Sequence, residues 1–237
     1  MSDHQLFENL YRTYSDGGIR ARLYYFHKKV AWTTVVGGTE LLKRFLDIAL
    51  SLLALLIFSP LFTLIAFLIY VESPGPVFFS QIRVGRYGRP FRMFKFRSMV
   101  VNAEQLLKKL KDQNESAAGV IFKMKKDPRI TKTGSFIRKT SIDELPQLWN
   151  VLKGDMSLVG PRPAIPSEVA EYTLDDRRRL DAIPGITCIW QVSGRSNIDF
   201  KGQVRLDTQY IESRSFWFDI QLLLKTIPAV LFGKGAY

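Results

Sequence analysis

The sequence is poor in residues that form disulfides or bind soft metal ions. It contains one cysteine, Cys188, and two histidines, His4 and His27, both within the first thirty residues. A single cysteine excludes an internal disulfide framework and is typical of a cytoplasmic environment. With so few of these residues, we do not expect a metal site built from histidine or cysteine. We therefore expect any bound metal to be a hard, oxygen-liganded ion such as Mg²⁺.

Charge is absent from one long stretch. From Ile48 to Val71 the sequence has 24 residues and no charged side chain, which as a helix would extend about 36 Å and exceed a hydrocarbon core of ~30 Å. Ser59 and Pro60 interrupt it: proline lacks an N–H and clashes with the carbonyl four residues earlier, and the serine hydroxyl can bond a nearby carbonyl. Two interpretations stay open here, a kinked span and a re-entrant hairpin whose arms are too short to cross.

Basic residues flank this stretch on both sides. Because basic residues stay on the cytoplasmic side, a single span should have one basic flank, so the double flank slightly favours a hairpin with both ends facing the cytoplasm. A buried core helix is a poorer explanation, since few soluble domains of this size enclose so long an apolar run. The basic residues are Lys28, Lys29, Lys43 and Arg44 before the stretch, and Arg83, Arg86, Arg89, Arg92, Lys95 and Arg97 after it.

Composition bounds the rest of the chain. Its 237 residues suffice for one sizeable domain, or a small domain with appendages. A net charge of +12 points to an anionic partner: nucleic acid, an anionic membrane face or phosphorylated substrates. The first forty residues lack an apolar core followed by a small-residue cleavage site, so we expect no secretory signal there.

The expected fold is α+β and predominantly helical. It comprises a re-entrant helix-break-helix, a small β-hairpin from VFFSQIRV and PFRMFKFRSM around GRYGR, and interfacial amphipathic helices. We expect helices over 102–113 and 218–232, a turn-rich connector over 127–140, and a helix that begins at Ser141. The predicted domains are an N-terminal lead-in (1–40), a membrane hairpin (41–72) and a catalytic domain at the cytoplasmic face (73–237).

The stretch SIDELPQLWN is the most informative for chemistry. Its structural interpretation is a capping box, with Ser141 at the N-cap and Glu144 three residues later. In the functional interpretation, Asp143 and Glu144 lie at a helix N-terminus, where backbone N–H groups keep acids ionised and attract phosphate. An ionised aspartate beside cations can attack phosphorus, and cations stand directly upstream at Lys132, Arg138 and Lys139.

Further polar residues are candidate phosphate contacts. Lys95 in FKFRSM, Arg162 in VGPRP and Arg195 in SGRSN are cations of the kind that bind phosphate groups. Each also has a structural interpretation, as a solvated strand residue or part of a loop. Asp207 and Tyr210 lie three apart on a predicted helix and so share a face.

Four stretches occur in order along the chain: KRFLDIALSLLALLIFSP, FKFRSM, IRKTSIDELPQLWNVLKGDMSLVGPRP and PGITCIWQVSGR. Together, from about Leu41 to Tyr237, they resemble the bacterial sugar transferase family, the monotopic polyprenyl-phosphate phosphoglycosyl transferases. The resemblance implies a re-entrant helix broken at Ser59 and Pro60. It also implies transfer of a phosphosugar from a UDP-sugar to polyprenyl (undecaprenyl) phosphate with release of UMP, the first membrane step of surface polysaccharide or glycoconjugate assembly.

The resemblance also implies roles for individual residues. Asp143 would be the nucleophile that forms a covalent aspartyl-phosphosugar, with Glu144 as its acidic partner. Mg²⁺ would be required, with Asp143 as its ligand. Lys95, Arg138, Arg162 and Arg195 fall at basic motif positions, and Asp207 is a weaker match. The sequence departs from the usual G-I-T-G-W-A-Q-V-N-G-R at Cys188 and Ile189, which puts the loop shape and the sugar preference in doubt.

The expected location is the cytoplasmic face of the bacterial inner membrane, as a monotopic protein whose partners are the bilayer, UDP-sugar and polyprenyl phosphate. No nucleic acid is expected, because such a partner gives the apolar stretch no purpose. A homodimer, with residues 1–40 as a contact or as an interfacial helix, stays open. The alternative is a non-catalytic, basic, membrane-anchored scaffold. A multi-pass transferase is disfavoured by the single long apolar segment.

Overall fold

The computed structural model describes residues 19–110, 127–194 and 197–232. The chain forms two compact units, residues 1–45 and 46–237. The first helix among the described residues, α2 (Ile19–Ile57), begins in the first unit and ends in the second. All later elements belong to the second unit. The division predicted at residues 40 and 72 stays a prediction.

The apolar stretch forms two helical arms. After α2 ends at Ile57, α3 (Ser59–Glu72) begins with Pro60 in its first turn, where the missing N–H of proline removes no helical hydrogen bond. The Ser59 hydroxyl donates to the carbonyl of Leu56 at 2.8 Å. In the described ranges no helix alone has the length and hydropathy of a membrane span, whereas Gly38–Ile57 and Ser59–Glu72, bent by 60°, have them together.

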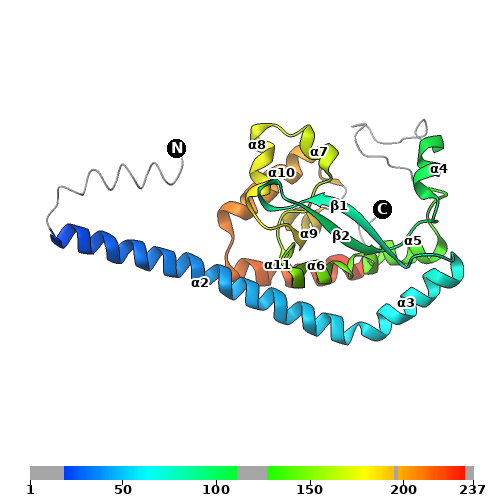
Figure 1. Cartoon of the computed structure of the whole chain (residues 1–237), viewed down its shortest axis with the longest axis horizontal. Coiled ribbons are helices and arrows are strands. Elements are labelled where there is room, and N and C mark those ends of the chain that lie inside the picture. Colours follow the sequence, from blue (N-terminus) through cyan, green and yellow to red (C-terminus); the bar gives the residue numbers. More distant parts are fainter. Residues whose placement is uncertain (1–18, 111–126, 195–196, 233–237) are drawn as a thin grey trace. The chain divides into compact units, whose positions relative to one another are not determined.

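The predicted β-hairpin is confirmed. Strands β1 (Phe78–Val84) and β2 (Pro90–Phe96) pair antiparallel, with Phe78 opposite Phe96 and Val84 opposite Pro90. The turn between them, η1 (Arg86–Gly88), holds Tyr87 at φ 57°. In Figure 1 this hairpin crosses the middle of the second unit, with α7, α8 and α10 beyond one side of it and α6 and α11 beyond the other.

A second, parallel strand pair was not predicted. Strands β3 (Ser157–Val159) and β4 (Gly185–Thr187) are three residues each and far apart in sequence, too short for an alternating pattern to be recognised. Glycine is required at 185, because a Cβ there would lie 2.0 Å from the Gly160 nitrogen. The pair places the residues just after β3 and β4 beside each other.

The described residues confirm a predominantly helical fold, with two differences from the expected boundaries. The helix predicted over 102–113 is described up to residue 110, and the helix predicted over 218–232 begins two residues earlier. The elements are α4 (Ala103–Leu110), α5 (Lys132–Lys139), η3 (Ile142–Glu144), α6 (Gln147–Lys153), α7 (Pro166–Ala170), α8 (Leu174–Arg177), η4 (Arg178–Asp181), α9 (Ile189–Ser193), α10 (Phe200–Ser213) and α11 (Phe216–Phe232).

Two local predictions are wrong. The segment predicted as a turn-rich connector contains α5, which Thr131 caps by accepting a hydrogen bond from the Gly134 N–H at 2.9 Å. Ser141 precedes the 3₁₀ turn η3 and no α-helix begins at it: it has φ 56°, a left-handed conformation, and its side chain makes no capping hydrogen bond. The left-handed residue reverses the chain after α5, so Asp143 and Glu144 lie on the short 3₁₀ turn η3 and the helix begins at Gln147.

One core cluster joins helix α3 to the rest of the second unit. Ile65 and Ile69 of α3 pack with Phe96 of β2 and Ile137 of α5, all at most 3% exposed. Burial of each such side chain contributes roughly 1.5 to 3 kcal/mol. Ile142, next to Asp143, packs against the same cluster, so α3 supports the segment that carries the paired acids.

Candidate active site

A cavity of about 760 Å³ lies beside η3, within the second unit. Its lining includes charged side chains from β2, α5, η3 and the loop after β3. Apolar side chains from the break between α2 and α3, from α9 and from α11 also line it, together with the polar Gln191 of α9 and Thr226 of α11. The charged residues are Lys95, Arg138, Asp143, Glu144 and Arg162, and the apolar ones include Phe58, Leu61, Trp190, Leu223, Ala229 and Val230.

Glu144 is held by two cations. Lys95 Nζ donates to Oε1 at 2.7 Å, and Arg162 donates to the same oxygen at 2.7 Å and to Oε2 at 3.4 Å. Burial alone would raise the pKa of Glu144, but Arg162 and Lys95 outweigh it and hold the pKa well below its ordinary value. Glu144 in turn raises the pKa of Arg162. The glutamate is therefore permanently ionised and fixes the positions of both cations.

Asp143 is in a different electrostatic state. It is 9% exposed, and its Oδ2 lies 3.9 Å from Lys95 Nζ. Burial raises the pKa of Asp143 to about 6, with Glu144 adding to the rise while Lys95, Arg138 and Arg162 oppose it. Burial therefore opposes the ionisation expected at a helix N-terminus, because η3 is a three-residue turn with little dipole and the site is buried. At neutral pH the carboxylate is still mostly ionised.

Two residues that the sequence reasoning missed support the cations. Asn150 holds β2, the strand of Lys95: its Oδ1 accepts from the Phe94 N–H at 3.0 Å and its Nδ2 donates to the Arg92 carbonyl at 2.6 Å. Arg83 donates to the Pro163 carbonyl at 3.1 Å, beside Arg162. Burial and the proximity of Arg162 lower the pKa of Arg83 to about 10. No local sequence signal reveals either contact, because the partners are distant in the chain.

Of the predicted site residues that the structure describes, Asp207 does not line this cavity. Arg195 lies outside the described residues. Asp207 is fully buried and is not among the described residues that line the cavity; it forms an ion pair with Arg179, which also donates to the Tyr172 hydroxyl. Burial raises the pKa of Asp207 to about 6 against the opposing effect of Arg179. Tyr210, on the same face of α10, is buried as well, so this face belongs to the core.

Of the two acids, Asp143 fits a magnesium ion that substrate phosphates also coordinate. No three His, Cys, Asp or Glu side chains of the described residues gather into a group that could hold a metal ion. Mg²⁺, however, usually binds through one or two carboxylates together with substrate phosphates and water. Because the Glu144 oxygens accept from Lys95 and Arg162, Asp143 is the carboxylate that fits, and phosphate oxygens would have to complete the coordination.

Comparison with known proteins identifies relatives. A model described as "Bacterial sugar transferase" matches residues 38–233. The chain is 54% identical over 195 residues to a galactosyl transferase, CpsE, of Streptococcus agalactiae, with 82% of this chain and 43% of that protein covered. It is 46% identical over 203 residues to an undecaprenyl-phosphate galactose phosphotransferase of Salmonella typhimurium, covering 84% of this chain and 42% of that protein.

A shorter relative matches over almost all of its own length. The exopolysaccharide production protein ExoY of Rhizobium meliloti is 39% identical over 205 residues, which cover 85% of this chain and 90% of that protein. The chain thus spans less than half the length of the Streptococcus and Salmonella proteins. The residues that the family model matches, 38–233, include the cavity and its charged residues.

Proposed function

Because the chain belongs to the bacterial sugar transferase family, we propose that it is a phosphoglycosyl transferase. It transfers a hexose 1-phosphate group from a UDP-sugar to polyprenyl phosphate, such as undecaprenyl phosphate, and releases UMP. The name of the Salmonella relative specifies undecaprenyl phosphate and a galactose phosphate group. The observation that carries the proposal is the cavity, whose lining combines cations and the Asp143 carboxylate with apolar side chains of the α2–α3 break and of α11, here called the apolar wall.

The charged side chains of the cavity suit the diphosphate group of a nucleoside diphosphate sugar. Two unit charges 4 Å apart repel by about 4 kcal/mol at an effective dielectric of 20, so an ionised Asp143 needs help to approach a phosphate. Lys95, Arg138 and Arg162 line the cavity beside it. Cations fixed before the reaction stabilise developing phosphate charge without reorganising. Glu144 contributes by holding two of these cations in place.

The reaction has two steps. An Asp143 carboxylate oxygen attacks the phosphorus that bears the sugar, and the bond from that phosphorus to the bridging oxygen breaks, so UMP leaves with the bonding electrons. A polyprenyl phosphate oxygen then attacks the same phosphorus, breaks its bond to Asp143 and regenerates the carboxylate. Bound beside Asp143 and the donor phosphates, Mg²⁺ would neutralise diphosphate charge.

The apolar wall suits a lipid acceptor. Phe58 and Leu61 come from the break between α2 and α3, and Leu223 and Val230 come from α11. A soluble acceptor would leave these side chains facing water, whereas the first units of a polyprenyl chain would cover them. The acceptor phosphate would then enter next to Asp143, from the membrane side of the cavity.

Membrane attachment follows from the same elements. We propose that the bent pair α2 and α3 enters and leaves the bilayer on the cytoplasmic side of the bacterial inner membrane, with α11 in the interface. In support, α11 exposes Trp217, Leu224 and Ile227, each more than half exposed. Aromatic and aliphatic side chains of this kind are typical of interfacial helices. The location keeps soluble UDP-sugar and lipid phosphate within reach of one site.

The test is UMP release. Purified protein with Mg²⁺ is given a panel of UDP-sugars, each with and without polyprenyl phosphate. We expect one or a few donors to give multiple turnovers with the lipid, and a single stoichiometric burst without it. The Asp143→Asn variant should give neither. A protein that releases no UMP from any donor, or that keeps full activity after Asp143→Asn, would instead be the membrane-anchored scaffold.

A further inference from the structure

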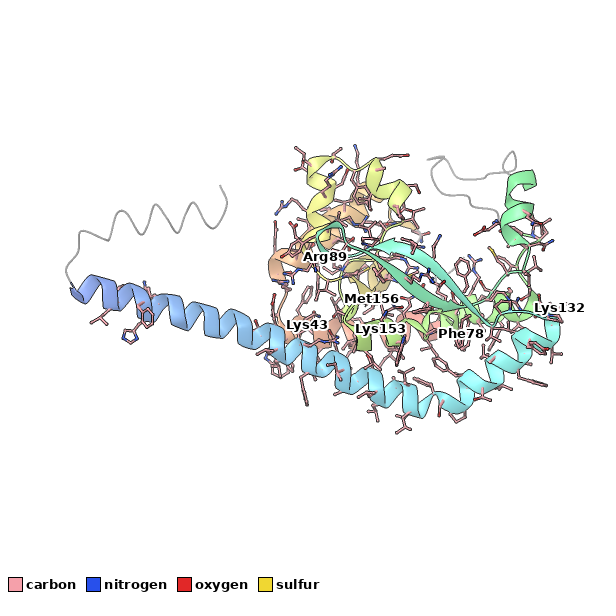
Figure 2. All side chains as sticks on the ribbon, viewed as in Figure 1. Lys43, Phe78, Arg89, Lys132, Lys153 and Met156 are labelled. Atoms are coloured by element: carbon pink, nitrogen blue, oxygen red, sulfur yellow. The ribbon has the colours of Figure 1, made fainter. Side chains whose placement is uncertain are left out.

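The N-terminus of α5 is held by a residue of the membrane hairpin. Glu72, the last residue of α3, accepts from the Lys132 N–H at 2.6 Å and from the Thr133 N–H at 2.8 Å, one bond to each carboxylate oxygen. Figure 2 labels Lys132 at the end of α3. Helix N-termini are usually capped by a neighbouring residue; these two bonds come from 60 and 61 positions earlier.

Glu72 acts in addition to a local cap. The next two free amides of α5, Gly134 N–H and Ser135 N–H, are satisfied by the side chain and the carbonyl of Thr131. Burial slightly opposes ionisation of Glu72, but the hydrogen bonds from Thr133 and Lys132 outweigh it and lower the pKa of the carboxyl. An ionised carboxylate is also favoured at a helix N-terminus. The first turn of α5 is therefore restrained by a local cap and by Glu72 of α3, and the Thr131 side chain takes part in both.

The start of α3 reaches the candidate site, and its end reaches α5. At its start, Leu61 lines the cavity. Along its length, Ile65 and Ile69 pack with Ile137, the residue before Arg138. Arg138 lines the cavity, and Ile142 of the same cluster adjoins Asp143. At the far end of α3, Glu72 accepts a hydrogen bond from the Lys132 N–H of α5.

We propose that Glu72 is a positioning residue through which the membrane hairpin holds α5, and with it Arg138 and the Asp143 turn, in the arrangement that the reaction needs. The inference rests on the proposed function and adds a dependence of the site on the hairpin. It assigns Glu72 no contact with substrate. Its effect on chemistry passes through the placement of Arg138 and Asp143.

The test compares three variants of the full chain in lipid nanodiscs: Glu72→Ala, Glu72→Gln and Thr131→Ala. The last is the comparison variant: it removes the local cap and the contribution of the Thr131 hydroxyl to the low pKa of Glu72, and it leaves the two backbone hydrogen bonds to Glu72 in place. Hydrogen exchange of peptides over residues 132–144 reports the local structure without any substrate. The burst of UMP release is measured with UDP-sugar and Mg²⁺, without acceptor, as a function of pH. Its pH dependence reports the ionisation of Asp143, which lies near Lys95, Arg138, Glu144 and Arg162.

For Glu72→Ala we expect faster exchange from the first turn of α5 through the Asp143 turn, and a burst about tenfold slower. The acid limb of its pH profile should move to higher pH, since Arg138, which lowers the pKa of Asp143, is less well held. Glu72→Gln, with one acceptor oxygen and no charge, should lie between wild type and Ala. Thr131→Ala should show faster exchange in the first turn alone, with an unchanged acid limb.

The proposal is overturned if Glu72→Ala affects exchange no further than Thr131→Ala does, or if the two variants show the same burst rate and acid limb. If the Ala variant does not fold, the same comparison is made with Glu72→Gln. A wild-type protein that releases no UMP would refute the proposed function, and the exchange measurements would still decide whether Glu72 holds the Asp143 turn.

Discussion

At the scale of single residues, the pKa values of the two adjacent acids are shifted in opposite directions. Glu144 is ionised and paired with two cations, whereas burial raises the pKa of Asp143 to about 6 from 3.8. That rise means that ionised Asp143 destabilises the fold at neutral pH by roughly 3 kcal/mol at most. A reactive, poorly paired carboxylate thus has a cost in stability.

The first prediction follows from that cost. Asp143→Asn should raise the apparent Tm by about 5 °C at neutral pH while abolishing UMP release. The native fold binds the Asp143 proton more tightly than the unfolded chain does, so the wild-type penalty is complete above about pH 6 and absent below about pH 4. The difference in Tm should disappear over that window. Asp127→Asn is the control and should lower the Tm at neutral pH. Hydrogen bonds from Arg129 outweigh burial and lower the pKa of Asp127, so its ionised form stabilises the fold.

The second prediction concerns the acid limb of the pH profile for kcat/KM of the donor, which reports groups of the free enzyme. Glu144→Gln removes a negative charge that raises the pKa of Asp143, so the limb should move below pH 6. Lys95→Met removes the strongest opposing charge, so the limb should move above it. Both variants should lose more than about tenfold in rate. Lys153→Met, half exposed beside Asp155, should change neither; equal limbs in all variants would mean that Asp143 does not govern the profile.

At the scale of elements, the sequence predicted the features that depend on local pattern. The alternation in VFFSQIRV and PFRMFKFRSM was enough for β1 and β2, and Pro60 marked the end of a helical arm. It could not predict what distant contacts decide: the parallel pairing of β3 and β4, and the ion pair of Asp207 with Arg179 in the core. At Ser141, a capping-box pattern was overridden by a left-handed residue after α5.

The third prediction distinguishes the donor step from the acceptor step by substitutions in α11. Leu223→Asn and Val230→Asn place polar groups on the apolar wall contributed by α11. They should weaken use of polyprenyl phosphate about tenfold in kcat/KM and leave the donor-only UMP burst nearly unchanged. Lys225→Ala, an exposed position on the same helix, is the control. A burst slowed as much as the full reaction would place this wall at the donor.

At the scale of the whole molecule, the net charge of +12 and the bent apolar pair suit attachment to an anionic membrane face. The fourth prediction is that both ends of the apolar stretch face the cytoplasm. Single cysteines at residues 38 and 76, with Cys188 replaced, should resist a membrane-impermeant thiol reagent in intact cells and react after lysis. Labelling of either position in intact cells would show a span in place of the hairpin.

Covalent capture of the sugar phosphate by Asp143 is the central step of the proposed reaction, and it can be observed directly. Wild-type protein is incubated with Mg²⁺ and the preferred UDP-sugar, without lipid acceptor, and is then quenched and digested for mass spectrometry. We expect a hexose phosphate on the peptide that contains Asp143, lost on addition of polyprenyl phosphate and absent from Asp143→Asn. Turnover that requires both substrates together, with no modified peptide at any time, would contradict the covalent mechanism.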